Sequence, residues 1–298
     1  MPRRTHKPEV SGSIPLLATN SLRSLNKMKN LKIYCISLNP KHKNLIEKLS
    51  YIPVGLGDKN FGQGWLQDRT GENIAFKNLH YGEYTFHYWL WKNKKINFNG
   101  WIGFCQYRKF WKNKQTNNPV TDFDSLNKIV LKEIPKKLEK FDSILLESQF
   151  INKFRLSKFI KHNLQTMLLD PKLFFFKHKR TLKFHFDMMH GNGNLDKAIE
   201  VLDKKEKDDF KKFVNTEVSF NPQNMFICKN KEILFSYYES LFPWLSRCEK
   251  IFGFKDLKGF GMQRIYGFLA ERYMSYWFKK YTKHAVLPMQ FKDITDFL

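Results

Sequence analysis

The sequence predicts an α/β fold in which a Rossmann-like mixed sheet is flanked by helices and followed by a helical C-terminal part. Three observations support this prediction. Two apolar, strand-like runs at 31–37 and 51–55 enclose a short helical segment, which is how nucleotide-type α/β sheets begin. A third run, at 101–105, follows an aromatic segment with helical spacing. Beyond residue 230 the chain is typical of long aromatic helices.

The composition indicates a globular protein. The chain has 298 residues, of which 42% are apolar and 16% aromatic, enough for one large domain or two small ones. Its net charge is +24, from 52 basic and 28 acidic residues, and the lysines are spread along the chain. A surface of this kind suits nucleic acid, an anionic membrane face or a phosphorylated small molecule.

The N-terminal segment differs from the rest. Residues 1–27 are basic and irregular, so we expect a disordered or non-native extension before a single domain at 28–298. No apolar run approaches the length of a membrane span. The 4 cysteines lie far apart without a CxxC pair, which is typical of reduced, buried thiols in a cytoplasmic protein.

The first elements alternate between strand and helix. We expect strands at 31–37 and 51–55 around a short helix near 44–49. The second strand enters a glycine-rich loop that matches neither the GxGxxG nor the Walker pattern. A turn over Asp68–Asn73 then leads to an aromatic helix from Leu79 to Lys92.

Two ionisable residues lie on this aromatic helix, for which Asn78 is the expected N-cap. Glu83 and His87 are four residues apart and would share a face. A carboxylate and an imidazole in such surroundings need partners or a ligand. The favoured interpretation is a hydrogen-bonded pair that anchors the helix, and the alternative is contact with a ligand.

Polar residues follow the strand at 101–105. This strand leads into Gln106-Tyr107-Arg108-Lys109, which places two cations at its carboxyl end. In an α/β fold, ligands bind at the carboxyl ends of strands. The sequence therefore predicts a binding site here, and a solvated strand end is the alternative.

The segment 150–186 mixes basic and aromatic residues. Such a segment suits an anionic membrane face or an acidic partner, and a solvated helical face over an aromatic core is the alternative. His185 and His190 follow without a third ligand nearby, which argues against a metal site.

The helical C-terminal part begins after a strand expected at 222–228, with Asn224 at its start. Asn230 would cap a long helix that reaches Phe252 and is bent or broken near Pro243.

The last helix is expected at 262–280, with Arg264, Gly267 and Glu271 on one stripe. Gly267 would let another group approach closely between the two charges. The alternative is a charged stripe that faces solvent.

Six motifs, in the same order along the chain, resemble the motifs of a known family. They stand at Asp68–Ile74, Glu83–Asn93, Gly103–Trp111, His190–Asp196, Asn224–Cys228 and Arg264–Arg272. The chain resembles, over about 30–280, the bacterial family identified as capsular polysaccharide or exopolysaccharide biosynthesis glycosyltransferases, long classed as a domain of unknown function. Gln106 stands where that family usually has His, and Lys109 where it has Arg. We therefore expect Gln106 to be a contact residue rather than a proton carrier.

The resemblance implies a GT-A-like fold and a glycosyltransferase of the hexosyltransferase class. The donor would be a nucleotide-diphosphate sugar, such as UDP-galactofuranose or another UDP-hexose. The acceptor would be a glycan or lipid-linked glycan of a capsule, O-antigen or exopolysaccharide. From the cysteines and the basic segment 150–186 we expect a cytoplasmic protein, at most peripheral at the inner membrane face, where contact with anionic lipid is the open question.

Position along the chain suggests roles for individual residues. The catalytic candidates are Glu83, Glu271 and His87. The candidates for holding the donor and its diphosphate are Asp68, Asn73, Lys77, Gln106, Tyr107, Arg108, Lys109 and Arg264. The acceptor is expected to face Asn224 and Trp89.

A divalent cation, Mn²⁺ or Mg²⁺, is the open question among cofactors. Asp122-Phe-Asp124 has the form of the metal-chelating DxD pattern, but it precedes a helix-like run, so helix capping explains it better. We expect Arg108 and Lys109 to neutralise the diphosphate directly.

Two other functions stay open. A basic nucleic-acid-binding protein would suit the charge, but no nucleic-acid-binding motif appears and no nucleic-acid partner is expected. A non-catalytic subunit of a polysaccharide assembly complex is the second alternative. The sequence names neither the donor sugar nor the acceptor.

Overall fold

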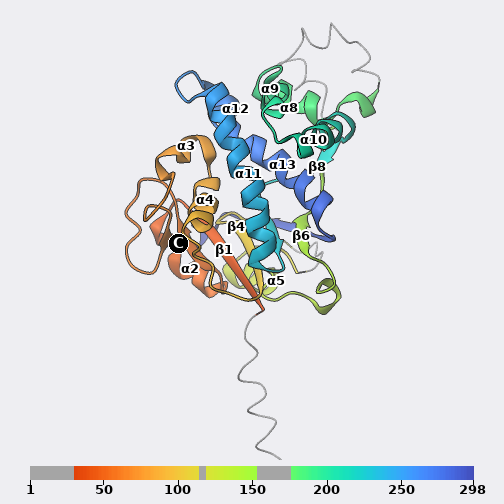
Figure 1. The fold of residues 1–298 in the computed structure, drawn as a ribbon. Helices are drawn as coiled ribbons and strands as arrows, with labels where there is room; N and C mark the ends of the chain where they lie inside the picture. The colour runs from red at the N-terminus through yellow and green to blue at the C-terminus, as the bar shows by residue number, and fades with distance from the viewer. Residues whose placement is uncertain (1–29, 114–118, 153–175) are drawn as a thin grey trace, which may run out of the picture. The chain divides into compact units, whose positions relative to one another are not determined.

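A mixed β-sheet is the centre of the unit formed by Leu31–Leu298, with its main strands in the order β10-β6-β9-β4-β1-β2-β3 (Figure 1). The parallel neighbours on one side are β1 (Leu31–Ser37), β2 (Ile52–Gly55), β3 (Leu66–Gln67) and β4 (Trp101–Gln106). The other side holds β9 (Phe226–Cys228), which is antiparallel to both its neighbours, then β6 (Ser143–Leu146) and β10 (His284–Leu287). The predicted α/β fold with a mixed sheet is confirmed.

The computed structural model describes residues 30–113, 119–152 and 176–298. The expectation for residues 1–27 and much of the basic segment 150–186 therefore lie outside the described residues. Two short strands extend the sheet beside β4, namely β5 (Lys109–Trp111) and β11 (Met289–Phe291). A separate pair joins β7 (Gln149–Phe150) to β8 (Ser219–Phe220).

Both faces of the central strands are buried. In β1, Ile33 and Cys35 belong to one apolar cluster, whereas Tyr34 and Ile36 belong to the cluster on the opposite face. Side chains alternate across a strand, so a continuous apolar run is what a strand covered on both faces requires. This is why the expected strand at 31–37 matches β1 residue for residue.

Helices cover both faces of the sheet. In chain order they are α2 (Lys43–Lys48), α3 (Asn78–Tyr81), α4 (Tyr84–Lys92), α5 (Phe123–Ile129), α8 (Leu182–His190), α9 (Asn194–Glu200), α10 (Lys204–Thr216), α11 (Lys231–Phe252), α12 (Gly259–Gln263) and α13 (Ile265–Tyr281). Figure 1 shows α8, α9 and α10 gathered together near α13, and α4 lies against α11. Three-residue 3-10 turns also precede α2 (Pro40–His42) and α3 (Ala75–Lys77).

The expected helix from Leu79 to Lys92 is wrong as a single element. It is two helices, α3 and α4, because Gly82 between them has a φ of +58°. Asn78 is not the N-cap but the first residue of α3. Its amide donates to the Gly82 carbonyl at 3.0 Å and to the Thr85 hydroxyl at 3.2 Å, which holds the break in place.

The C-terminal part also departs from expectation. The last helix is broken at Arg264, where α12 ends and α13 begins. By contrast, α11 continues through Pro243 without a break, and Asn230 caps it as predicted by accepting from the Ile233 N–H at 3.0 Å. The strand expected at 222–228 has only the residues of β9.

Candidate active site

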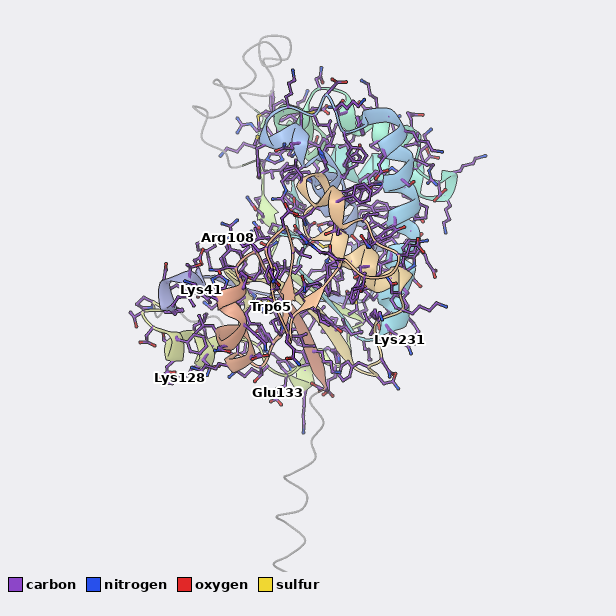
Figure 2. All side chains as sticks on the ribbon, turned by 90° about the vertical axis from the view of Figure 1, so that its left-hand side faces the viewer. Lys41, Trp65, Arg108, Lys128, Glu133 and Lys231 are labelled. Atoms are coloured by element: carbon purple, nitrogen blue, oxygen red, sulfur yellow. The ribbon has the colours of Figure 1, made fainter. Side chains whose placement is uncertain are left out.

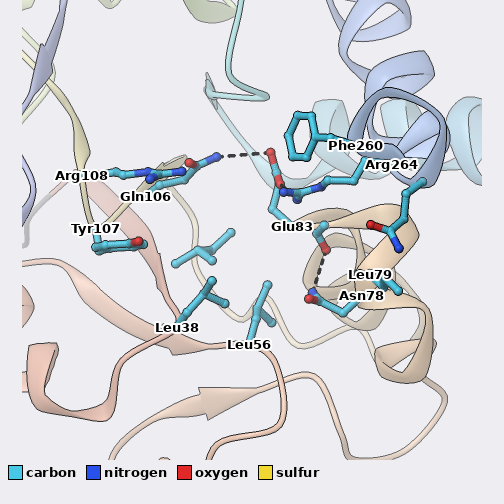
Figure 3. A pocket seen from close by; sticks show the side chains of 13 residues that line it. Leu38, Leu56, Asn78, Leu79, Glu83, Gln106, Tyr107, Arg108, Phe260 and Arg264 are labelled. Carbon is cyan, nitrogen blue, oxygen red and sulfur yellow. Dashed lines mark hydrogen bonds and ion pairs between the residues drawn. The ribbon is translucent and has the colours of Figure 1, made fainter. Parts of the chain in front are cut away.

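The carboxyl ends of three parallel strands border a cavity of about 290 Å³ (Figure 3). Its apolar floor comes from Ile36 near the end of β1, from Leu38 just after β1 and from Leu56 after β2. Its polar wall contains Glu83, Gln106, Arg108 and Arg264, and its remaining lining is Asn78, Leu79, Gly82, Tyr107, Phe260 and Gln263. The strand end at which the sequence predicts a binding site thus borders a cavity.

A tight hairpin between β4 and β5 carries the predicted cations. Gln106 of β4 pairs antiparallel with Lys109 of β5, so Tyr107 and Arg108 form the turn. The Tyr107 N–H donates to the Ile36 carbonyl at 2.9 Å, which fixes the turn against the end of β1. Arg108 is exposed at the upper edge of the sheet, on the side opposite Glu133 in Figure 2.

A second cavity, of about 160 Å³, continues the first. The two share Glu83, Gln106, Arg108, Phe260 and Arg264, so they form one cleft. The second part adds Lys109, Gln223, Asn224, Gly267, Phe268 and Glu271. The cleft therefore brings together eight of the predicted donor, acceptor and catalytic residues. They are Glu83, Gln106, Tyr107, Arg108, Lys109, Asn224, Arg264 and Glu271.

Glu83 is held from three sides at the break between α3 and α4. Its carboxylate accepts from the amide of Asn224 at 2.8 Å and from that of Gln106 at 3.2 Å. The Arg264 guanidinium lies 3.5 Å from its other oxygen. Two amides and one cation therefore fix this carboxylate at the junction of the two cavities.

Glu271 lies deeper, on α13. It accepts the backbone N–H of Gln223 at 2.6 Å and pairs with the neighbouring guanidinium of Arg272. Burial raises the pKa of the Glu271 carboxyl, against the opposing effect of Arg272. The Arg272 guanidinium is buried behind it, 4.2 Å from the centre of the Phe220 ring.

Lys109 reaches the cleft from β5. Its ammonium donates to the side-chain oxygen of Gln106 at 3.2 Å and to that of Gln223. Burial lowers the pKa of Lys109, while the Glu83 carboxylate raises it. The amine is thus partly desolvated, which strengthens its interaction with any anion that enters.

Five of the predicted site residues do not line the cleft. The hydrogen-bonded pair of Glu83 and His87 is wrong: His87 is fully buried and its Nδ1 contacts the Tyr238 hydroxyl at 2.6 Å. The Trp89 indole is also buried and donates to the Thr70 carbonyl at 2.7 Å. Packing within aromatic surroundings, rather than a ligand, explains both side chains.

The predicted donor residues before α3 lie apart from the cleft as well. Lys77 donates to both oxygens of Glu249, at 2.7 and 2.8 Å, and lines a different cavity between α3, α4 and α11. Asn73 bonds locally to the Gly71 carbonyl and the Ala75 N–H. Asp68 is buried, and this burial raises the pKa of its carboxyl.

Sequence patterns missed several cleft residues. Gln223 contacts Lys109 and Glu271 but belongs to no motif-like spacing. Leu38, Leu79 and Phe260 are 49%, 57% and 68% exposed and border the cavity. The sequence does not show which apolar side chains are exposed, so these three could not be found from it.

No described group of three or more His, Cys, Asp or Glu side chains is arranged to hold a metal ion within residues 30–113, 119–152 and 176–298. Asp122 of the DxD-like pair accepts from the Ser125 N–H at 2.7 Å in a capping box, as the sequence predicts. His190 contacts the Gly261 carbonyl at 2.9 Å, and His185 approaches the Arg272 guanidinium at 3.3 Å.

Comparison with known proteins places the chain in a family. It matches the family model described as "Domain of unknown function (DUF4422)" over residues 32–283, and it belongs to that family. The apo structure of the bifunctional glycosyltransferase WbbM has the same fold, with a TM-score of 0.61 and 22% sequence identity. The likeness covers 88% of this chain and 45% of that one, so the chain spans about half of the WbbM structure. The fold is thus GT-A-like, as expected. A search of curated proteins found no match.

Proposed function

We propose that this protein is a glycosyltransferase that moves a sugar from a nucleotide-diphosphate donor to a growing surface polysaccharide. The observation that carries the proposal is the cleft at the carboxyl ends of β1, β2 and β4. There, three cations (Arg108, Lys109 and Arg264) lie beside two carboxylates (Glu83 and Glu271). The name of WbbM, a glycosyltransferase of the same fold, supports it. We propose that residues 28–298 act as one catalytic unit.

The two ends of the cleft suit the two ends of such a donor. The apolar floor of Ile36, Leu38 and Leu56 offers contact to a nucleoside. Figure 3 shows Arg108 and Arg264 extending into the cavity from opposite sides, and a guanidinium binds phosphate oxygens in a bidentate manner. A nucleoside diphosphate would therefore lie with its base on the floor and its phosphates between the two arginines. UDP-galactofuranose and other UDP-hexoses are the donors to examine first.

The reaction requires a base and charge stabilisation of a leaving group. In an inverting transfer, the acceptor hydroxyl oxygen bonds to the anomeric carbon as the bond from that carbon to the diphosphate breaks. The hydroxyl proton passes to a carboxylate, Glu83 or Glu271, and the nucleoside diphosphate takes the electron pair. Arg108 and Lys109 stabilise the charge that develops on the diphosphate, an effect worth about 3 kcal/mol per donor in other enzymes. Asn224 beside Glu83 is placed to face the acceptor.

A divalent ion is the competing way to neutralise the diphosphate. At the end of β4, where a DxD pattern would stand, the chain has Gln106, Tyr107, Arg108 and Lys109. The oxygen ligands that Mg²⁺ and Mn²⁺ prefer are represented in the cleft mainly by Glu83 and Glu271, and both already accept hydrogen bonds. We therefore assign the neutralising role to the cations of the chain.

The direct test combines binding and chemistry. Purified full-length protein is screened by thermal shift against UDP-, GDP-, CMP- and dTDP-sugars, since a bound donor raises the melting temperature. Stabilising donors are then assayed for sugar release and for transfer to glycan acceptors. Release or transfer supports an enzyme; a protein that neither binds nor turns over any of these donors is not the proposed transferase. Salt-sensitive binding of single-stranded nucleic acid in place of a sugar nucleotide would favour the nucleic-acid alternative.

We also propose peripheral contact with an anionic membrane on the cytoplasmic side. Phe76, Leu79 and Phe260 are 81%, 57% and 68% exposed. The imidazole of His80, next to Leu79, contacts the Gln263 carbonyl at the end of α12 at 2.7 Å, which joins these surfaces. Exposed apolar side chains next to exposed lysines, here Lys255 and Lys258, suit a lipid surface. No helix within the described ranges is both long and apolar enough to span a membrane.

A further inference from the structure

Two consecutive residues with left-handed backbones precede β9. Gln223 has a φ of +73° and Asn224 a φ of +53°. This conformation is uncommon for residues other than glycine, and although asparagine tolerates it, glutamine has no such preference. Backbone strain of this kind persists only where the surroundings over-determine it, and it occurs preferentially at functional sites.

The turn contacts four polar residues of the cleft. From the Gln223 backbone, the N–H donates to Glu271 at 2.6 Å and the carbonyl accepts from the Gln106 amide at 3.4 Å. The Gln223 side chain accepts from the Lys109 ammonium. The Asn224 amide donates to Glu83 at 2.8 Å, and its oxygen accepts from the Tyr84 hydroxyl at 3.0 Å.

The Gln223 side chain contacts a cation that has two carboxylates in its surroundings. Both Glu83 and Glu271 act electrostatically on Lys109. Even so, no carboxylate oxygen within the described ranges lies within 4.0 Å of the Lys109 ammonium, the distance that defines an ion pair. The ammonium is bonded instead to the neutral amide oxygens of Gln106 and Gln223. A direct ion pair would neutralise the charge of Lys109 and would lower the pKa of the carboxyl group that joins it.

We propose that the Gln223–Asn224 turn is the positioning element of the cleft, and that Gln223 holds Lys109 away from the two carboxylates. Lys109 then stays available to an incoming diphosphate, and Glu271 stays basic enough to accept a proton. Gln223 is a positioning residue, since it acts through Lys109 and Glu271. The inference rests on the proposed function for its effect on rate, but its structural part does not.

The test compares Gln223→Gly, which suits the left-handed backbone, with Gln223→Asn, which keeps a shorter amide. Removing the side chain lets Lys109 pair with a carboxylate. We expect kcat to fall about 100-fold in Gln223→Gly. The acidic limb of the pH profile of kcat/KM should move about one pH unit lower, because an adjacent cation lowers the pKa of a carboxyl group. Gln223→Asn should recover part of the rate.

The same variant separates positioning from stability. Glycine relieves the strained backbone, so Gln223→Gly should unfold at a urea concentration no lower than the wild type. A wild-type rate and pH profile in Gln223→Gly would overturn the proposal. So would a rate loss that simply follows a loss of stability.

A double-mutant cycle tests the contact between Gln223 and Lys109 without an assay of transfer activity. Gln223→Gly and Lys109→Gln are combined, and their effects on urea unfolding are compared with the sum of the single effects. Non-additive effects support the contact between the two side chains, and additive effects contradict it. If the wild type transfers no sugar while the cycle shows coupling, the proposed function fails and the positioning role of the turn stands.

Discussion

The guanidinium of Arg264 lies 3.5 Å from the carboxylate of Glu83, and each residue stands at a break between two helices. Glu83 directly precedes α4 and follows Gly82, whereas Arg264 separates α12 from α13. Both side chains extend from these breaks and line the cleft. One of the two proposed catalytic carboxylates, Glu83, and the proposed diphosphate-binding residue Arg264 therefore both stand at helix breaks.

The first prediction concerns Gly82. A Cβ there would lie 2.2 Å from the Nη2 atom of Arg264, so in Gly82→Ala the flexible arginine must move away from Glu83. Gly253 is the matched control: its φ of +56° is close to the +58° of Gly82, but a Cβ would meet nothing within 4 Å. Both alanine variants should lose about 1–2 kcal/mol of unfolding free energy in urea because of the left-handed backbone.

Only Gly82→Ala should lose transfer activity, by about tenfold in kcat/KM, because it alone displaces a cleft residue. Equal activity in the two variants would show that the contact between Arg264 and Glu83 does not matter for the reaction.

The second prediction separates the two carboxylates. Glu83→Gln and Glu271→Gln keep the size of the side chain but remove its ability to take a proton. The variant that lacks the base should lose about 100-fold or more in kcat and should no longer show the acidic limb of the pH profile. Burial raises the pKa of Glu271. If Glu271 is the base, the midpoint of the acidic limb should therefore lie above the usual pKa range of glutamate. Wild-type rates in both variants would contradict the assignment.

The third prediction concerns pH and stability. Burial lowers the pKa of His87 to about 3, whereas the unfolded chain has the ordinary value of 6.5. Above 6.5 both states are neutral. Below it the unfolded state binds the proton first, so stability should fall by about 1.4 kcal/mol per pH unit until about pH 3.

His87→Asn, whose amide can still reach Tyr238, should be less sensitive to acid by about that slope. The measurement is the free energy of urea unfolding between pH 7 and pH 4.5. His185 and His190, with pKa values of about 2 and about 3, contribute in the same direction in both proteins. Identical slopes in the wild type and the variant would mean that His87 is not buried in its neutral form.

The fourth prediction concerns the lipid surface. Wild-type protein should sediment with vesicles that contain phosphatidylglycerol and not with pure phosphatidylcholine, and salt should weaken the binding. The double variant Phe76→Ser/Phe260→Ser and the double variant Lys255→Gln/Lys258→Gln should each bind less.

The controls are Val286→Ser, at a 48% exposed position on β10, and Lys128→Gln on α5, which should bind as the wild type does. Equal binding by all five proteins would show that the membrane contact lies elsewhere on the chain. Binding by none of them would show that there is no such contact.

Local sequence patterns were sufficient for the central strands β1 and β4. The apolar runs predicted both strands, and the cations that follow β4 line the cleft. Gly267 was expected to allow a close approach, and a Cβ there would lie 3.3 Å from the carbonyl oxygen of Tyr81 on α3. These features depend on residues that are neighbours in the sequence or on one side chain, so they can be predicted from one amino-acid sequence.

What the sequence could not provide is the irregular backbone. The aromatic spacing of Tyr81, Tyr84 and Tyr88 continues across Gly82, so periodicity alone predicted one helix. The left-handed conformation of Gln223 has no sequence signal, because glutamine does not favour it. His87 and Trp89 looked polar enough for a site, but only the fold shows that the His87 Nδ1 contacts the Tyr238 hydroxyl and that the Trp89 indole donates to the Thr70 carbonyl.

In the proposed reaction, side-chain cations rather than a divalent ion neutralise the departing diphosphate. The most direct measurement is kcat/KM for the donor sugar in EDTA, for the wild type, Arg108→Gln, Arg108→Lys and the control Lys128→Gln. The wild type and control should keep full activity in EDTA, while Arg108→Gln should lose about 100-fold and Arg108→Lys should recover part of it. Activity that disappears in EDTA and returns with Mn²⁺, or a wild-type rate in Arg108→Gln, would contradict the account.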